Sequence, residues 1–265
     1  MDDPRAHIEV RGLELAYGPF VVMRDLDFQV RRGEVFVIIG GSGCGKSTLL
    51  RQMVGLKPTH HGDILYDDKS LVGASPAERD LLTRKFGVLF QAGALWSGLT
   101  VAENVGLPLE QHTGLSGAKI SELVRLKLAW VGLRGFEDFY PAQLSGGMAK
   151  RAGLARALAL DPEILFFDEP SAGLDPVTAE RLDELILQLR DNLGTTVVVV
   201  THELTSIFRI ADRALFLNAR TRTMTALGSP RQLLREAKDP AVREFLSRGT
   251  PSVPKTDQPY SIEHP

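Results

Sequence analysis

The stretch VFVIIGGSGCGKST, residues 35–48, joins a continuous apolar run to a loop rich in glycine. Val35 to Ile39 are all β-branched or aromatic, which is typical of a strand covered on both faces. The loop that follows, from Gly40 to Thr48, matches the pattern Gly-x-x-x-x-Gly-Lys-Ser/Thr in full. It lies between this strand and a helical segment, as the pattern requires. The stretch therefore predicts a phosphate-binding loop in an α/β fold.

The residue types in this loop suit ATP with Mg²⁺. Glycines allow backbone N–H groups to curl around phosphates, which the positive N-terminal end of the next helix also attracts. We expect Lys46 to bridge the β- and γ-phosphates and Ser47 to offer its hydroxyl to Mg²⁺. Cys44 should contribute only its backbone, although its thiol is also a candidate site of oxidation. The predicted ATP-binding residues of the loop are Gly40, Gly41, Ser42, Gly43, Cys44, Gly45, Lys46, Ser47 and Thr48.

Two further apolar runs, Ile164–Phe167 and Val197–Val200, predict more strands at the centre of a parallel sheet. A helical pattern lies between them, with Asp175 as its cap, Pro176 at its start and Gly194 at its end. The residues predicted to form its apolar stripe are Leu182, Leu185, Ile186, Leu189 and Leu193. Strands alternating with helices indicate an α/β core.

Other segments differ from this core. Ile8–Arg11 and Phe28–Arg31 alternate apolar with polar residues, which predicts exposed antiparallel strands. The sequence SPAE at 75–78 has the spacing of a capping box and predicts a helix start. Residues 92–156 show helical patterns with Gly and Pro breaks and predict an inserted helical region. Residues 250–265 are polar and rich in proline, and we expect them to form a tail.

Two carboxylates follow the apolar run that ends at Phe167. Asp168 is expected to hold Mg²⁺, directly or through water, and Glu169 to polarise the attacking water. Taken alone, such a pair is more often a solvated loop or a helix cap. Downstream of a phosphate loop, it indicates nucleotide hydrolysis.

The segment LSGGM, residues 144–148, precedes another helical segment, and here the sequence resembles the ABC ATPase family. The family signature is Leu-Ser-Gly-Gly-Gln, so Met148 departs from it while Ser145, Gly146 and Gly147 match. A serine hydroxyl and two glycine amides at a helix N-terminus can bind a phosphate, although the tripeptide alone could be an ordinary capped turn. The resemblance implies that the signature meets the ATP bound by a second copy, so that hydrolysis requires a homodimer.

The resemblance implies further site residues. Gln91 matches the glutamine between core and helical subdomain, with a catalytic role and as a Mg²⁺ ligand. Asp175 ends the segment SAGLD that matches the family's D-loop, and we expect it to contact nucleotide. His202 matches the switch histidine, which contacts the γ-phosphate and keeps Glu169 aligned. Tyr17 matches the aromatic residue that stacks on adenine, and the alternative is a tyrosine that packs only on its strand neighbour.

The same resemblance implies a RecA-like phosphate-loop core with a mostly parallel sheet, an N-terminal antiparallel β-subdomain and a helical ABC subdomain. We expect an ATPase domain over residues 1–249, with the core at 1–91 and 157–249 and the helical subdomain at 92–156. Leu95 and Trp96 either form an apolar surface for a permease or belong to the core.

Three segments narrow the resemblance to ATPases of the Mce or Mla type, which serve bacterial phospholipid transport. They are QAGAL at 91–95, MAKRA at 148–152 and DPAVREFL at 239–246. This likeness implies a phospholipid or other hydrophobic cargo, a separate membrane permease, an Mce-domain protein and a small STAS-domain partner.

Composition supports a chain that reaches the membrane only through a protein partner. The net charge of -2 gives no overall attraction to nucleic acid or anionic lipid. The longest apolar runs are far shorter than the ~20 residues needed to cross a bilayer. The polar start lacks the features of a signal peptide, and the single cysteine suits a reducing compartment. We therefore expect a peripheral protein at the cytoplasmic face of the bacterial inner membrane, with no nucleic-acid partner.

Three alternatives remain open. An ATPase of an importer of polar solutes such as amino acids normally has glutamine where Met148 stands. A non-transport ABC ATPase usually carries coiled-coil insertions or two fused cassettes, which this sequence lacks. A phosphate-loop kinase or binding module leaves Ser145–Gly147 and His202 without a role.

Overall fold

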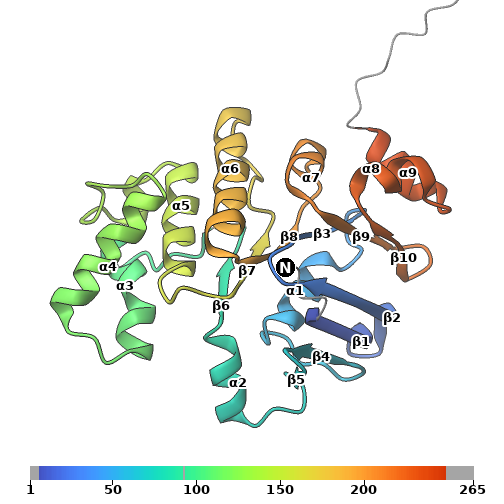
Figure 1. Ribbon diagram of the computed structural model, residues 1–265, viewed down its shortest axis with the longest axis horizontal. Coiled ribbons are helices and arrows are strands. Elements are labelled where there is room, and N and C mark those ends of the chain that lie inside the picture. Colours follow the sequence, from blue (N-terminus) through green and yellow to red (C-terminus); the bar gives the residue numbers. More distant parts are fainter. Residues whose placement is uncertain (1–5, 92, 249–265) are drawn as a thin grey trace, which may run out of the picture.

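The computed structural model describes residues 6–91 and 93–248 (Figure 1). The predicted tail, residues 250–265, lies outside these residues. The strands are β1 (Ala6–Tyr17), β2 (Phe20–Arg31), β3 (Val35–Gly40), β4 (Asp63–Tyr66), β5 (Lys69–Ser70), β6 (Phe86–Leu89), β7 (Ile164–Asp168), β8 (Thr196–Val200), β9 (Arg213–Asn218) and β10 (Thr223–Gly228). The helices are α1 (Lys46–Met53), α2 (Pro76–Thr83), α3 (Val101–His112), α4 (Gly117–Trp130), the 3-10 helix η1 (Pro141–Gln143), α5 (Gly146–Ala157), α6 (Pro176–Leu193), α7 (Leu204–Ile210), α8 (Pro230–Glu236) and α9 (Pro240–Ser247).

The larger sheet of the described residues has the strand order β10-β9-β3-β8-β7-β6. Strand β3 pairs in parallel with both β8 and β9, and β7 pairs in parallel with β6 and β8. Only β10, at the edge, runs antiparallel within this described sheet. The predicted parallel centre is therefore confirmed, and the α/β fold class with it.

Alternate residues of β3 enter two different hydrophobic cores, as the two-residue period of a strand requires. Val35, Val37 and Ile39 pack in a core that contains Ile186 of α6 and the buried side chains of α3, α4, α5 and α7. Phe36 and Ile38 pack in a core with α1 and the smaller sheet. Because β3 is covered on both faces, its position and that of the loop after it are fixed.

The smaller sheet has the order β2-β1-β4-β5, and its pairings are antiparallel. Apolar residues of β1 and β2, such as Val10 and Phe28, are buried, while their neighbours Arg11 and Gln29 are exposed. The alternating pattern therefore predicted these strands correctly.

Helix caps follow their sequence signals. Ser75 and Glu78 form the predicted capping box at α2. Asp175 caps α6, and Gly194 ends it in a left-handed conformation with a φ of 65°. The predicted stripe is buried or half-buried as far as Leu189, but including Leu193 was wrong. That residue is 51% exposed because it is the last of the helix, where the chain turns away through Gly194.

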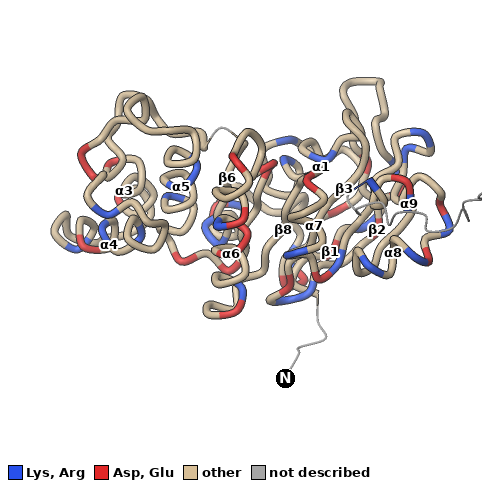
Figure 2. Tube along the Cα trace, turned by 90° about the horizontal axis from the view of Figure 1, so that it is seen from above, with Lys and Arg blue, Asp and Glu red and all other residues tan. Residues whose placement is uncertain are grey.

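Helices α3, α4 and α5 pack on one another at one end of the molecule, with α6 between them and α1 (Figure 1). Among the described residues, no helix has both the length and the apolar composition to cross a bilayer. Lys and Arg are interspersed with Asp and Glu from one end of the trace to the other (Figure 2).

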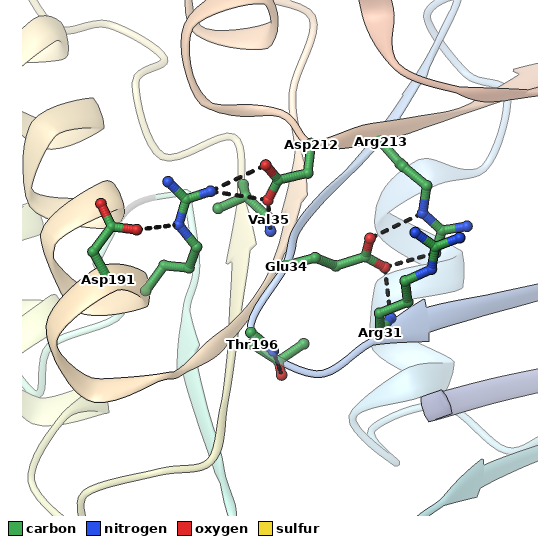
Figure 3. A network of polar contacts seen from close by, with 9 residues as sticks. Arg31, Glu34, Val35, Asp191, Thr196, Asp212 and Arg213 are labelled. Carbon is green, nitrogen blue, oxygen red and sulfur yellow. Dashed lines mark hydrogen bonds and ion pairs between the residues drawn. The ribbon is translucent and has the colours of Figure 1, made fainter. Parts of the chain in front are cut away.

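Charged side chains hold the start of β3 (Figure 3). Glu34 receives two hydrogen bonds from Arg213, at 2.9 and 2.7 Å, and one from the Arg31 N–H at 2.6 Å. Asp212 accepts a hydrogen bond from the Val35 N–H at 2.8 Å. These contacts join the start of β3 to the start of β9. They lie at the end of β3 opposite the phosphate loop.

Candidate functional site

The carboxyl ends of β3, β6, β7 and β8 meet at one edge of the larger sheet, the usual place for ligand binding in such sheets. A cavity of about 760 Å³ opens there, within the range of small-molecule sites. It is lined by Tyr17, Phe20, Val22, Gly40, Gly41, Ser42, Gly43, Gly45, Lys46, Ser47, Thr48, Gln91, Glu169, His202, Phe245 and Arg248. Most residues predicted to bind or hydrolyse ATP therefore share this cavity.

The phosphate loop closes on its own lysine. Lys46 donates hydrogen bonds to the carbonyl oxygens of Gly40 at 3.0 Å and Gly41 at 3.1 Å, which holds the ammonium group inside the loop. Helix α1 starts after Gly45, whose φ is 95° and which provides no side-chain cap. The first N–H groups of the helix therefore remain available to an anion.

Gly40 must be glycine for steric reasons. Its φ is 150°, and a Cβ at this position would lie 2.4 Å from the Leu217 carbonyl oxygen and 2.8 Å from Sγ of Cys44. The Cys44 side chain is buried beneath the loop, and burial raises the pKa of its thiol. A buried thiol is poorly accessible to oxidants, so burial argues against the expectation of an oxidation-sensitive cysteine.

Two oxygen atoms of the kind that bind hard cations lie side by side. Ser47 Oγ donates a hydrogen bond to Asp168 Oδ1 at 2.8 Å, and Asp168 is buried at the end of β7. A hydroxyl beside a carboxylate is the donor set that Mg²⁺ prefers, so these residues fit the ion.

Glu169 lies beside the predicted switch histidine. His202 Nδ1 is 2.9 Å from Glu169 Oε1, although the two residues are 33 positions apart. The Glu169 backbone has a φ of 51°, and its N–H donates to the Val200 carbonyl oxygen at 2.8 Å. A non-glycine residue in the left-handed region is strained, which is common where a side chain is held for function.

Tyr17 lines the cavity and is 54% exposed. Its hydroxyl lies 2.8 Å from Thr48 Oγ1, so its ring is held beside the first turn of α1. That hydrogen bond, followed by the charge of Lys57, lowers the pKa of the Tyr17 phenol. Lys57 was not identified from the sequence, and its ammonium lies 3.1 Å from the centre of the ring.

The loop that carries Gln91 is held from α5. Arg156 donates hydrogen bonds to the carbonyl oxygens of Gly93 at 3.0 Å and Ala94 at 2.7 Å. A Cβ on Gly153 would lie 2.8 Å from the Gly93 carbonyl oxygen, so the loop packs directly on the helix. Beyond it, Trp96 is 64% exposed whereas Leu95 packs against the core. Trp96 therefore fits the alternative of an exposed apolar surface, and Leu95 fits the alternative of a core residue.

The segment Ser145–Gly147 does not line the cavity of its own chain. Ser145 caps α5 by accepting a hydrogen bond from the Met148 N–H at 3.3 Å. A Cβ on Gly146 would meet nothing within 4 Å, so this end of α5 is open to an approaching group. Helices α5 and α1 lie apart (Figure 1).

Asp175 does not line the cavity either. It accepts hydrogen bonds from the Thr178 N–H at 3.0 Å and the Thr178 hydroxyl at 2.5 Å, and the bond from this hydroxyl lowers the pKa of the carboxyl group. Nearby, Lys150 of α5 donates hydrogen bonds to the carbonyl oxygens of Pro170, at 2.9 Å, and Ala172. Burial lowers the pKa of this lysine. The helix after the signature is thereby tied to the loop after Glu169.

The sequence did not identify Phe20, Val22, Phe245 and Arg248 as cavity residues. Phe245 and Arg248 come from the last described helix and the residue after it, more than 40 positions beyond His202. The segment DPAVREFL at 239–246 contains Phe245 but gave no indication of a place in the nucleotide site, so only the fold could bring these residues there.

Comparison with known proteins gives a consistent result. The profile of the family described as "ABC transporter" matches residues 23–172. The chain is 40% identical over 239 residues to the intermembrane phospholipid transport system ATP-binding protein MlaF of Escherichia coli K12, covering 90% of this chain and 88% of that protein. It is 39% identical over 240 residues to the probable ribonucleotide transport ATP-binding protein mkl of Mycobacterium tuberculosis H37Rv, covering 91% of this chain. It spans only 66% of the length of that relative.

Solved structures share the fold. CbiO1 of Clostridium perfringens, part of the ABC transporter complex cbiONQ, aligns with a TM-score of 0.78 and 27% identity, covering 89% of this chain and 92% of that one. The ATP-binding cassette MJ0796, solved as a dimer in a post-hydrolysis state with ADP and Pi, aligns with a TM-score of 0.77 and 30% identity. That alignment covers 84% of this chain and 98% of the cassette.

Proposed function

The chain belongs to the ABC transporter family, and from this premise we propose that it is an ATP-binding and ATP-hydrolysing subunit that powers phospholipid transport through a separate permease. One observation supports hydrolysis above all. Ser47, Glu169 and His202 line one cavity with the phosphate loop, where Ser47 is hydrogen-bonded to the buried Asp168 and Glu169 lies beside His202. The likeness to MlaF, a phospholipid transport protein by name, supports the cargo.

Binding of the triphosphate falls to the loop and its helix. Backbone N–H groups at the start of α1 face the phosphates, and the Lys46 ammonium exchanges its carbonyl partners for β- and γ-phosphate oxygens. Ser47 and Asp168, which already contact each other, would hold Mg²⁺, and Gln91 would be a further ligand. When bound, this ion neutralises charge on the terminal phosphates. Tyr17 stacks on the adenine.

Hydrolysis uses the pair at the strand ends. Glu169 orients the attacking water and takes its proton, and His202 holds the carboxylate in place while it contacts the γ-phosphate. Ser145, Gly146 and Gly147 of a second copy complete the site, and Asp175 lies at the same interface. The open end of α5 supports this arrangement. A single copy should therefore hydrolyse ATP slowly.

We further propose that the homodimer works at the cytoplasmic face of a bacterial inner membrane, where it contacts the membrane only through its permease. Exposed Trp96 offers the permease an apolar contact beside the Gln91 loop. An Mce-domain protein and a STAS-domain partner complete the assembly. The likeness to MlaF supports a phospholipid transport system, and the two accessory partners rest on the resemblance of the sequence segments named above to Mce-type ATPases.

The test is co-purification of the Glu169→Gln variant with ATP from gently solubilised membranes, followed by mass spectrometry of bound proteins and lipids. A permease with an Mce-domain protein and phospholipid supports the proposal. Polar-solute partners or bound ribonucleotide would contradict the cargo while leaving ATP hydrolysis standing. The Lys46→Ala variant is the control, because it should not retain ATP and should not capture the ATP-dependent complex.

A further inference from the structure

Lys57 is a buried cation in an unusual setting. Its Nζ atom is inaccessible to solvent and has no hydrogen-bond partner among the described residues. It lies 3.1 Å from the centre of the Tyr17 ring. An ammonium group without hydrogen bonds is costly to bury, and attraction to the face of an aromatic ring offsets part of that cost.

The ammonium group covers one face of the Tyr17 ring. Tyr17 is a cavity residue and half exposed, whereas Lys57 does not line the cavity and its Nζ is buried. The ring is thus in contact with a cation while the residue keeps an exposed surface in the cavity that contains the phosphate loop.

The two supports of the ring come from α1 and from the turn that follows it. Thr48, in its first turn, lies 2.8 Å from the Tyr17 hydroxyl. At its other end, the N–H groups of Leu56 and Lys57 donate to the Arg51 carbonyl oxygen at 2.8 and 3.1 Å, which fixes the turn. The ring thus keeps a constant position relative to the phosphates.

We propose that Lys57 is a positioning residue for the nucleobase, holding the Tyr17 ring against its covered face so that a purine stacks on the open face. This inference rests on the proposed function, in which Tyr17 meets the adenine of ATP. The cation also draws π density towards the covered face, which reduces repulsion between the open face and the π system of the purine. Lys57 therefore contributes to recognition of the base and contributes nothing to recognition of the phosphates.

The experiment measures binding of ATP and of inorganic tripolyphosphate to the full chain by calorimetry with Mg²⁺. Lys57→Met should weaken ATP binding about 3- to 10-fold and leave tripolyphosphate binding within about twofold. Lys57→Arg should retain ATP affinity, because a guanidinium also stacks on a ring. In a Tyr17→Leu background, Lys57→Met should have no further effect on ATP affinity.

Several results would overturn the inference. Equal loss for both ligands indicates a general structural role, as does a loss of ATP affinity that adds to that of Tyr17→Leu. Unchanged ATP affinity in Lys57→Met shows that the ring needs no cation. If the parent chain binds neither ligand, both the proposed function and the inference are wrong; if the parent binds ATP and only the Lys57 effect is missing, the inference alone is wrong.

Discussion

His202 Nδ1 lies 2.9 Å from Oε1 of Glu169, and the two residues follow neighbouring parallel strands. The Glu169 N–H also donates to the carbonyl oxygen of Val200, the last residue of β8. The carboxylate and its histidine are therefore held to the same strand end, and movement of β8 relative to β7 would disturb both. This geometry makes the pair suited to orienting one water molecule.

We expect Glu169→Gln to retain ATP affinity but to hydrolyse ATP about 10²- to 10³-fold more slowly, because an amide does not accept the proton of the attacking water. ATP-bound dimers should accumulate and elute earlier in gel filtration. Glu203→Gln is the matched control, since Glu203 is exposed beside the same histidine and should change the rate by less than about twofold. Hydrolysis by Glu169→Gln at the parental rate would show that another group activates the water.

Replacement of Gly146 tests the role of the signature across the dimer. A Cβ there meets nothing within 4 Å in the chain itself, so Gly146→Ala should fold and bind ATP normally. We expect hydrolysis to fall at least about tenfold, because the methyl group blocks close approach of the partner's phosphates. Gly117→Ala is the control, because Gly117 is also the first residue of a helix with free space around it. Equal rates in the two variants would place the signature outside the catalytic site.

Removal of the Ser47 hydroxyl should raise the Mg²⁺ requirement. In Ser47→Ala, we expect the Mg²⁺ concentration for half-maximal hydrolysis to rise at least about tenfold, as is usual when a metal ligand or its hydrogen-bonded neighbour is lost. ATP binding in the presence of EDTA should stay unchanged, because the lysine and the backbone of the loop remain. An unaltered Mg²⁺ titration would mean that Asp168 binds the ion without Ser47.

The sequence predicted the parts of the fold that local patterns determine. Five apolar residues before the phosphate loop indicated β3, and Asp175 with Gly194 marked both ends of α6. It also indicated that Asp168 and Glu169 follow a buried strand. Each of these features depends on residues close together in the chain, where propensity, capping and burial act on the same segment.

Contacts between distant segments could not be predicted. Lys57 and Tyr17 are 40 positions apart, and nothing in the residues around either one indicates the other. Lys150 was seen only as a residue of a helical segment, although it binds two carbonyl oxygens after Glu169. Leu193 had the correct period for burial, but the pattern does not show where a helix leaves the core.

Acid should destabilise the fold through His7. Burial, followed by the charge of Arg32, lowers the pKa of this histidine below its usual 6.5, while nearby Asp67 and Glu163 act in the opposite direction. The unfolded chain therefore takes up a proton before the folded chain does. Stability is fully present above a pH of about 6.5 and decreases as the pH falls towards the folded pKa.

We expect the free energy of unfolding to fall less between pH 7 and pH 5 in His7→Gln than in the parent, as measured by urea denaturation at each pH. The variants are compared by the change in the free energy of unfolding with pH. Its absolute value also reflects the loss of the contact between His7 and Thr196. His60→Gln, at an exposed position, should keep the parental slope. If the free energy of unfolding of His7→Gln fell with pH as steeply as that of the parent, the acid sensitivity would come from other groups.

Arg213→Met should destabilise the chain by about 3 kcal/mol, because it leaves the buried Glu34 carboxylate without its cation. Urea denaturation measures this loss. Adding Glu34→Gln to Arg213→Met should recover part of it, since a neutral amide is less costly to bury and still accepts the Arg31 N–H. Glu122→Gln, which breaks the exposed pair with Lys119, should cause no measurable change. If the double variant were less stable than Arg213→Met, the loss would come from packing of the arginine side chain instead of from an uncompensated charge.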